Sequence, residues 1–145
     1  MKIGQLTYDE KQLMIDYLVN RAGEPGKDPL VIAICDGAKE LVSLTMMDGT
    51  YKMNEHLASN KAYTAALLHQ TTKSWKEFME KKGTNLAVYG DPRMTSLPGG
   101  TPVITEDDVL LGAVGVSGWS MEEDQMLASE AVEALKSAWR EGERR

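Results

Sequence analysis

Two histidines, His56 and His69, carry the side chains best suited to ligate a metal or to move a proton near neutral pH. They are 13 residues apart in a segment with helical periodicity, which places them ~20 Å apart along one helix axis and on roughly opposite faces. They therefore cannot ligate one metal ion within a single subunit. His69 falls at the expected last turn, where an imidazolium interacts favourably with the helix dipole. His56 is thus the better candidate for a ligand contact, with a plain surface position as the alternative.

Glycines could bring bare backbone close to a ligand at two places, Gly99-Gly100 and the segment 115–118 around Ser117. Exposed amides at such places can bind an anion such as a carboxylate. Ser117 also precedes an expected helix, whose free amides favour anions. Tight turns and sheet packing explain the same glycines equally well, and the sequence leaves both explanations open.

Lys61 and Cys35 are the other reactive side chains that the pattern singles out. Lys61 could meet an acidic group of a ligand, although solvation is the commoner fate of a lysine. If a pocket exists, we expect Lys61, Gly99, Gly100 and Ser117 to approach it. Cys35 is the single cysteine, which excludes an internal disulfide and a multi-cysteine zinc or iron–sulfur site. It ends an apolar run, which predicts a buried small hydrophobe.

Helix boundaries are marked by two capping boxes, Thr7 with Glu10 and Ser120 with Glu123. Asn54 is the expected cap of another helix. An apolar run at 30–35 is hydrophobic on both parities, which is typical of a central strand. The expected order is helix 8–22, strands 30–35 and 41–46, helix 54–69, a short helix from 72, a loop over 84–97, strands 101–104 and 109–116, and a final helix from 121.

Apolar stripes predict which helix faces are buried. A stripe of small residues should allow close approach to a sheet or to another subunit: Ala58, Ala62, Ala65 and Ala66. The short helix is expected to face inward with Trp75, Phe78 and Met79 and to end at Gly83. The final helix is expected to face inward with Met126, Leu127, Ala131, Ala134, Leu135 and Ala138, and to expose an acidic face.

Composition narrows the classes of protein. The 145 residues, 42% hydrophobic, fit one domain over 1–145. A net charge of -6 disfavours nucleic acid as a partner. No apolar run near the start approaches the ~20 residues of a membrane span, and no leader precedes it. We therefore expect a cytoplasmic protein that does not contact membranes.

Three blocks in this order resemble the GlcG/HbpS family, also called the haem-degrading domain family, which includes the carboxy-terminal domain of some corrinoid adenosyltransferases. The blocks are Met47-Asp48-Gly49, Asn60-Lys61-Ala62-Tyr63-Thr64-Ala65-Ala66, and Pro98-Gly99-Gly100-Thr101-Pro102-Val103 with the GAVGVSG segment at 112–118. The resemblance implies a profilin-like α+β fold, with an antiparallel sheet of about five strands flanked by helices, assembled as a homo-oligomer. One departure is the turn 36–40, where family members tend to carry a Gly-Gly pair and this chain has Gly37-Ala38.

The same resemblance implies haem as a possible cofactor, because some members bind it. His56 is then the expected metal-contacting residue, with Lys61, Gly99, Gly100 and Ser117 as further candidates for cofactor binding. The first hypothesis is an accessory protein of catabolic metabolism that binds haem or another small molecule. The alternatives are an enzyme acting on a small organic acid at the glycine-lined site, and a structural oligomer within a larger assembly. Whether the chain has catalytic activity stays open at this stage.

Overall fold

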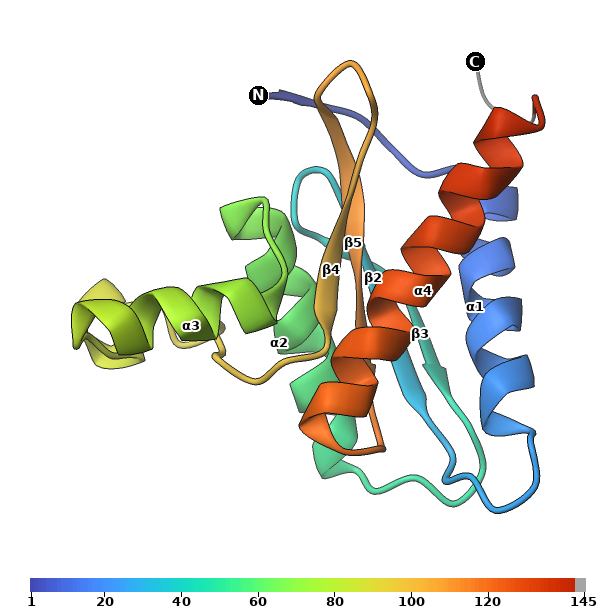
Figure 1. Ribbon diagram of the computed structural model, residues 1–145, viewed down its shortest axis with the longest axis horizontal. Coiled ribbons are helices and arrows are strands. Elements are labelled where there is room, and N and C mark those ends of the chain that lie inside the picture. Colours follow the sequence, from blue (N-terminus) through green and yellow to red (C-terminus); the bar gives the residue numbers. More distant parts are fainter. Residues whose placement is uncertain (143–145) are drawn as a thin grey trace.

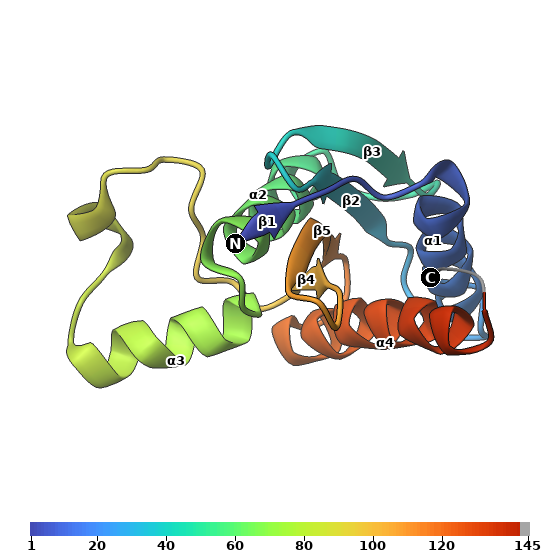
Figure 2. The same cartoon turned by 90° about the horizontal axis from the view of Figure 1, so that it is seen from above.

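A five-stranded sheet covered by helices on both faces forms the centre of the computed structural model, which describes residues 1–142 (Figure 1). Helix α2 packs on one face, and α1 and α4 pack on the other. Helix α3 extends away from the sheet (Figure 2). The elements are β1 (Lys2–Ile3), α1 (Tyr8–Ala22), β2 (Val31–Asp36), β3 (Leu41–Met46), α2 (Met53–Leu68), α3 (Thr72–Lys82), the 3-10 helix η1 (Leu86–Tyr89), β4 (Gly100–Ile104), β5 (Val109–Ser117) and α4 (Met121–Arg140).

Strand β5 is the middle of the sheet. It pairs antiparallel with β2 on one side and with β4 on the other, and β3 extends the sheet beyond β2. The two residues of β1 pair parallel with Val109 and Leu110, so the expected sheet of about five strands is confirmed but is not wholly antiparallel. Strand β2 is interior, as its apolar run predicts. Pro102 lies in β4, an edge strand that tolerates a missing amide donor.

The two parities of β2 separate the hydrophobic core into two layers. Ile32 and Ile34 point toward α1 and α4, where they join the larger cluster. Val31, Ala33 and Cys35 point toward α2, in a layer otherwise made mostly of alanines. A strand that is buried on both faces needs apolar residues at successive positions, which is the pattern this sequence has.

Helix α2 lies unusually close to β5 because small residues meet on both sides. The four alanines of its stripe are all fully buried against the sheet. Directly beneath them, a Cβ on Gly115 would overlap the carbonyl oxygen of Ala58. The stripe is therefore used within the subunit, and the expectation that it forms a surface between subunits is wrong.

Helix ends follow the local chemistry with one exception. Both capping boxes are confirmed, at Thr7 and at Ser120. Asn54 is not a cap, because α2 begins at Met53 and Lys52 precedes it without a side-chain cap. Gly83 ends α3 in the left-handed conformation expected of it.

Two side chains predicted to face inward do not. Phe78 in α3 and Met126 in α4 are 44% and 42% exposed, whereas their neighbours Trp75, Met79 and Leu127 are buried. Phe78 is turned outward because α3 rests on the rest of the molecule mainly through α2 and β4, with Gln125 of α4 bonded to its first residues. A helix that touches its neighbours along so narrow a contact buries a narrower stripe than a core helix does.

Candidate functional site

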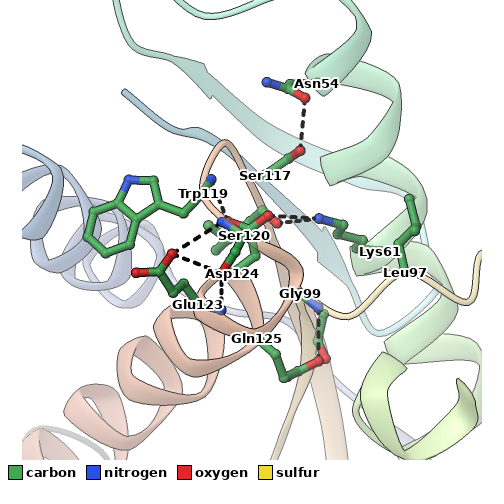
Figure 3. Close-up of polar contacts among 12 residues, drawn as sticks. Asn54, Lys61, Leu97, Gly99, Ser117, Trp119, Ser120, Glu123, Asp124 and Gln125 are labelled. Atoms are coloured by element: carbon green, nitrogen blue, oxygen red, sulfur yellow. Dashed lines mark hydrogen bonds and ion pairs between the residues drawn. The ribbon is translucent and has the colours of Figure 1, made fainter. Parts of the chain in front are cut away.

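Lys61 lies on the buried face of α2 rather than on the surface, so the expectation of a solvated lysine is wrong. It is 2% exposed. Its Nζ donates a hydrogen bond to the carbonyl oxygen of Val116 at 2.8 Å. The same Nζ lies 3.3 Å from Oδ2 of Asp124. Figure 3 shows the side chain reaching from α2 toward the beginning of α4.

The Asp124 carboxylate contacts both Lys61 and the backbone just before α4. Its Oδ1 accepts a hydrogen bond from the backbone N–H of Trp119 at 2.9 Å, while Oδ2 faces Lys61. Burial raises the pKa of the Asp124 carboxyl and lowers that of the Lys61 ammonium, and each charge partly offsets the effect of burial on the other. Asp124 therefore satisfies an amide just before the Ser120 cap, while the Ser120 hydroxyl accepts from the amide of Glu123 in the first turn.

Gly99 and Gly100 lie against Lys61, where a larger side chain would not fit. A Cβ on Gly99 would lie 2.8 Å from Cδ of Lys61, at a φ of +135° that also favours glycine. Their amides are already paired, from Gly99 to Oε1 of Gln125 and from Gly100 to Oγ1 of Thr72, each at 2.9 Å. Both glycines serve close packing, which was one of the two explanations left open.

Gln125 joins three segments around the glycines. Its Nε2 donates to the carbonyl oxygen of Gly100 at 3.1 Å and to Oγ1 of Thr101 at 2.9 Å. Its Oε1 accepts from Thr72 at 3.2 Å as well as from Gly99. This one side chain therefore links α4 to the beginning of α3 and to β4.

Ser117 lies at the end of β5, one residue beyond the carbonyl group that Lys61 contacts. It is 3% exposed, and its hydroxyl donates to Oδ1 of Asn54 at 3.1 Å. The structure thus brings Lys61, Gly99, Gly100 and Ser117 together, as the sequence predicts, but as a filled polar cluster.

Both histidines lie outside this cluster. His56 is exposed in the first turns of α2, and His69 is exposed at its end. His69 has a φ of 58°, so it ends the helix in the left-handed conformation, which agrees with the structural role expected for it. His56 shares a helix face with Met53, three residues earlier, whose side chain is 64% exposed.

Asp124 and Gln125 are the cluster residues that sequence reasoning missed. Asp124 ends the acidic first turn of α4 and Gln125 follows it, in a stretch that the sequence pattern assigns to the solvent-facing side. The signal that could have identified them is their spacing from the Ser120 cap, because Asp124 and Gln125 follow it by about one helical turn. The first residues of a helix face whatever precedes it, and here that is the end of β5.

Hollows lie away from the cluster, and two of them are well defined. One, of about 670 Å³, lies between the β4–β5 turn and the second half of α4, against Val109, Glu133 and Trp139. The other, of about 410 Å³, lies between α3 and η1. Within residues 1–142, no three His, Cys, Asp or Glu side chains are grouped so as to hold a metal ion. No helix in that range is long and apolar enough to cross a membrane.

Comparison of the sequence with known families and proteins identifies relatives of this chain. Residues 6–133 match the family described as haem degrading protein HbpS-like. An uncharacterised 15.0 kDa protein from the dhaT-dhaS intergenic region of Citrobacter freundii is 32% identical over 109 residues, which cover 74% of this chain and 76% of that protein. The chain belongs to the HbpS-like family, and the resemblance noted from its sequence blocks is confirmed.

Two further relatives match smaller shares of their own length. Protein GlcG of Escherichia coli is 38% identical over 86 residues, 59% of this chain and 62% of GlcG. Corrinoid adenosyltransferase PduO of Salmonella typhimurium is 29% identical over 113 residues, which cover 74% of this chain but 32% of PduO. The region shared with PduO is thus about a third of that enzyme.

Solved structures have the same fold. Protein ORFY of Klebsiella pneumoniae superposes with a TM-score of 0.83 at 26% identity, covering 94% of both chains. PduOC, solved as a haem complex, gives a TM-score of 0.79 at 24% identity and covers 90% of this chain and 94% of its own. HbpS of Streptomyces reticuli gives 0.80 at 21% identity, covering 93% and 90%.

Proposed function

We propose that this protein is a self-associating accessory protein of catabolic metabolism that binds haem or a related small molecule. The observation that carries the proposal is its membership of the HbpS-like family over residues 6–133. The haem complex of PduOC, which has the same fold, supports haem as the first ligand to test.

His56 has the chemistry that a haem iron requires. Haem binding needs an axial donor beside an apolar surface. The His56 imidazole is exposed, and Met53 on the same helix face and Tyr51 just before α2 are 64% and 77% exposed. Neither of the two hollows includes these residues. A porphyrin held there would lie on an open surface of one subunit, so a second subunit would have to complete its enclosure.

The buried cluster would support such a site indirectly. The polar atoms of Lys61, Gly99, Gly100 and Ser117 that it contains bond within the chain, so we assign them the role of fixing α2 against β5. His56 lies on that helix, and its position depends on how α2 is held. The rival proposal of an enzyme acting on an organic acid needs free amides at the glycines, which have internal partners here.

A haemin titration tests the proposal. We expect a saturable Soret shift with a defined stoichiometry, together with a rise in thermal stability, because a ligand that binds only the folded state stabilises it. Small organic acids serve as the comparison ligands. Stabilisation by an organic acid without any Soret shift would instead favour the enzyme, and no response to either class would favour the structural oligomer.

A further inference from the structure

Residues 72–97 form an arm, which comprises α3, η1 and the segment that returns to β4. Figure 2 shows it projecting from the layered part of the molecule, which we call the body. Helix α3 packs mainly against α2 and β4, and its first residues bond to Gln125 of α4. At its base the arm is held firmly, with the amide of Thr95 donating to Oγ1 of Thr64 at 3.0 Å and Arg93 lying 3.9 Å from the centre of the Tyr63 ring.

The outer part of the arm presents apolar side chains that the subunit does not cover. Phe78, Val88 and Tyr89 are 44%, 69% and 41% exposed. Phe78 stacks on Trp75 with ring centres 5.6 Å apart, and Tyr89 meets Trp75 edge-on at 5.0 Å. Contiguous exposed aromatics of this kind mark an interaction surface more often than ordinary solvent-facing positions.

Trp75 adds a second, independent observation. Its side chain is buried, and its indole Nε1–H has no hydrogen-bond partner among residues 1–142. Leaving a buried donor unpaired costs ~1–3 kcal/mol of stability, so such donors are rare in native proteins. An acceptor brought by another molecule to the aromatic side of the arm would remove that cost after a small local adjustment.

The distribution of charged residues along the chain indicates which partner the arm binds. The arm contains five Lys and Arg residues against three Asp and Glu, whereas the rest of the chain contains eleven against nineteen. The arm is therefore basic and the remainder strongly acidic. Opposite charge on two parts of one polypeptide favours docking of the arm of one copy on the body of another.

We propose that the arm of one subunit docks on the acidic body of a second copy of this chain, with Phe78, Val88 and Tyr89 at the contact. This inference deepens the self-association in the proposed function and does not depend on haem. A failed haemin titration would leave it standing. A double variant that still associates would overturn the docked arm alone, whereas a monomeric wild type would overturn self-association in the proposed function as well.

Sedimentation across a range of protein concentrations tests the contact. The wild type should have a mass that is a multiple of 16.0 kDa. The double variant Val88→Ser/Tyr89→Ser should raise the dissociation constant about tenfold or more, because exposed apolar anchors dominate such contacts. Tyr8→Ser is the matched control, since Tyr8 is 72% exposed on α1, outside the arm. A wild type that stays monomeric, or a double variant that associates as tightly as the wild type, would overturn the proposal.

Cross-linking determines which surfaces meet. Unlabelled and heavy-isotope chains are mixed, and lysine is coupled directly to carboxylate. Lys81 and Lys82 at the end of α3 should then form links between chains of different label, to carboxylates of the body. Links from these lysines that occur only within one chain would exclude the docked arm even if the protein is oligomeric.

Discussion

Lys61 on α2 and Asp124 on α4 form a buried ion pair that spans the edge of the sheet, with Nζ and Oδ2 3.3 Å apart and both side chains at most 4% exposed. The pair connects two helices that lie on opposite faces of the sheet. Removing one partner leaves the other as an uncompensated buried charge, which costs far more than the intact pair contributes.

Lys61→Met should therefore lower the free energy of unfolding by ~3–5 kcal/mol, measured by urea denaturation. Lys52→Met is the matched control, because Lys52 pairs with Glu55 on the same helix while 81% exposed, and its loss should cost under ~0.5 kcal/mol. In the double variant Lys61→Met/Asp124→Asn the total cost should fall below the sum of the two single costs. Equal effects of Lys61→Met and Lys52→Met would contradict this account.

Gly115 is a position on β5 where an added methyl group would meet the backbone of α2. Gly115→Ala should destabilise the protein by ~3 kcal/mol, since its Cβ would overlap the backbone of α2 at Ala58. Gly23→Ala is the control, because its Cβ would meet only ordinary contacts of 3.4 Å or more at a φ of -77°. Thermal unfolding of the two variants should differ clearly, and similar melting temperatures would contradict the close packing.

Cys35 makes stability depend on pH in the alkaline range. Burial raises the pKa of its thiol from 9.0 to about 12. Between these two values the unfolded thiol ionises while the folded thiol keeps its proton, so the free energy of unfolding falls by ~1.4 kcal/mol for each pH unit. The stability difference between the wild type and Cys35→Ala should therefore shrink as pH rises from 9 toward 12 in urea titrations. A difference that is independent of pH would show that the thiol ionises equally in both states.

His56→Ala should weaken haemin binding and change the Soret and visible bands, because an axial nitrogen would be lost. His69→Asn is the control at the other end of α2, since asparagine tolerates the left-handed φ of 58°. Its spectrum should match that of the wild type. If His56→Ala leaves both affinity and spectrum unchanged, His56 is not the donor, and the residues between Met53 and Tyr63 become the next to test.

Local signals in the sequence were enough to predict most of the fold. The capping boxes at Thr7 and Ser120 fixed two helix beginnings, and the apolar run of β2 identified an interior strand. The prediction that Asn54 caps a helix is wrong because its side chain has a tertiary partner instead. Its Oδ1 accepts a hydrogen bond from Ser117, 63 residues away. Partners so distant in sequence leave no periodicity that could predict them.

The candidate site could be predicted only in part for the same reason. The glycines and Lys61 were correctly grouped, but the state of Lys61 depends on Asp124, which the helical pattern assigns to a solvent-facing turn. Whether an acidic first turn faces water or a buried lysine is decided by the tertiary arrangement. Phe78 was misassigned because periodicity indicates an apolar face but not whether the same subunit covers it.

The central place of β5 has a consequence for synthesis of the protein on the ribosome. Strands β2 and β4 both pair with β5, which begins at residue 109, three-quarters of the way along the chain. Neither pairing can form before β5 has been synthesised. Until it emerges, the hairpin of β2 and β3 has one unpaired apolar edge and α2 has little sheet to cover. Folding therefore completes late, and the nascent chain exposes that edge to aggregation from the synthesis of β3, which ends at Met46, until that of β5, which ends at Ser117.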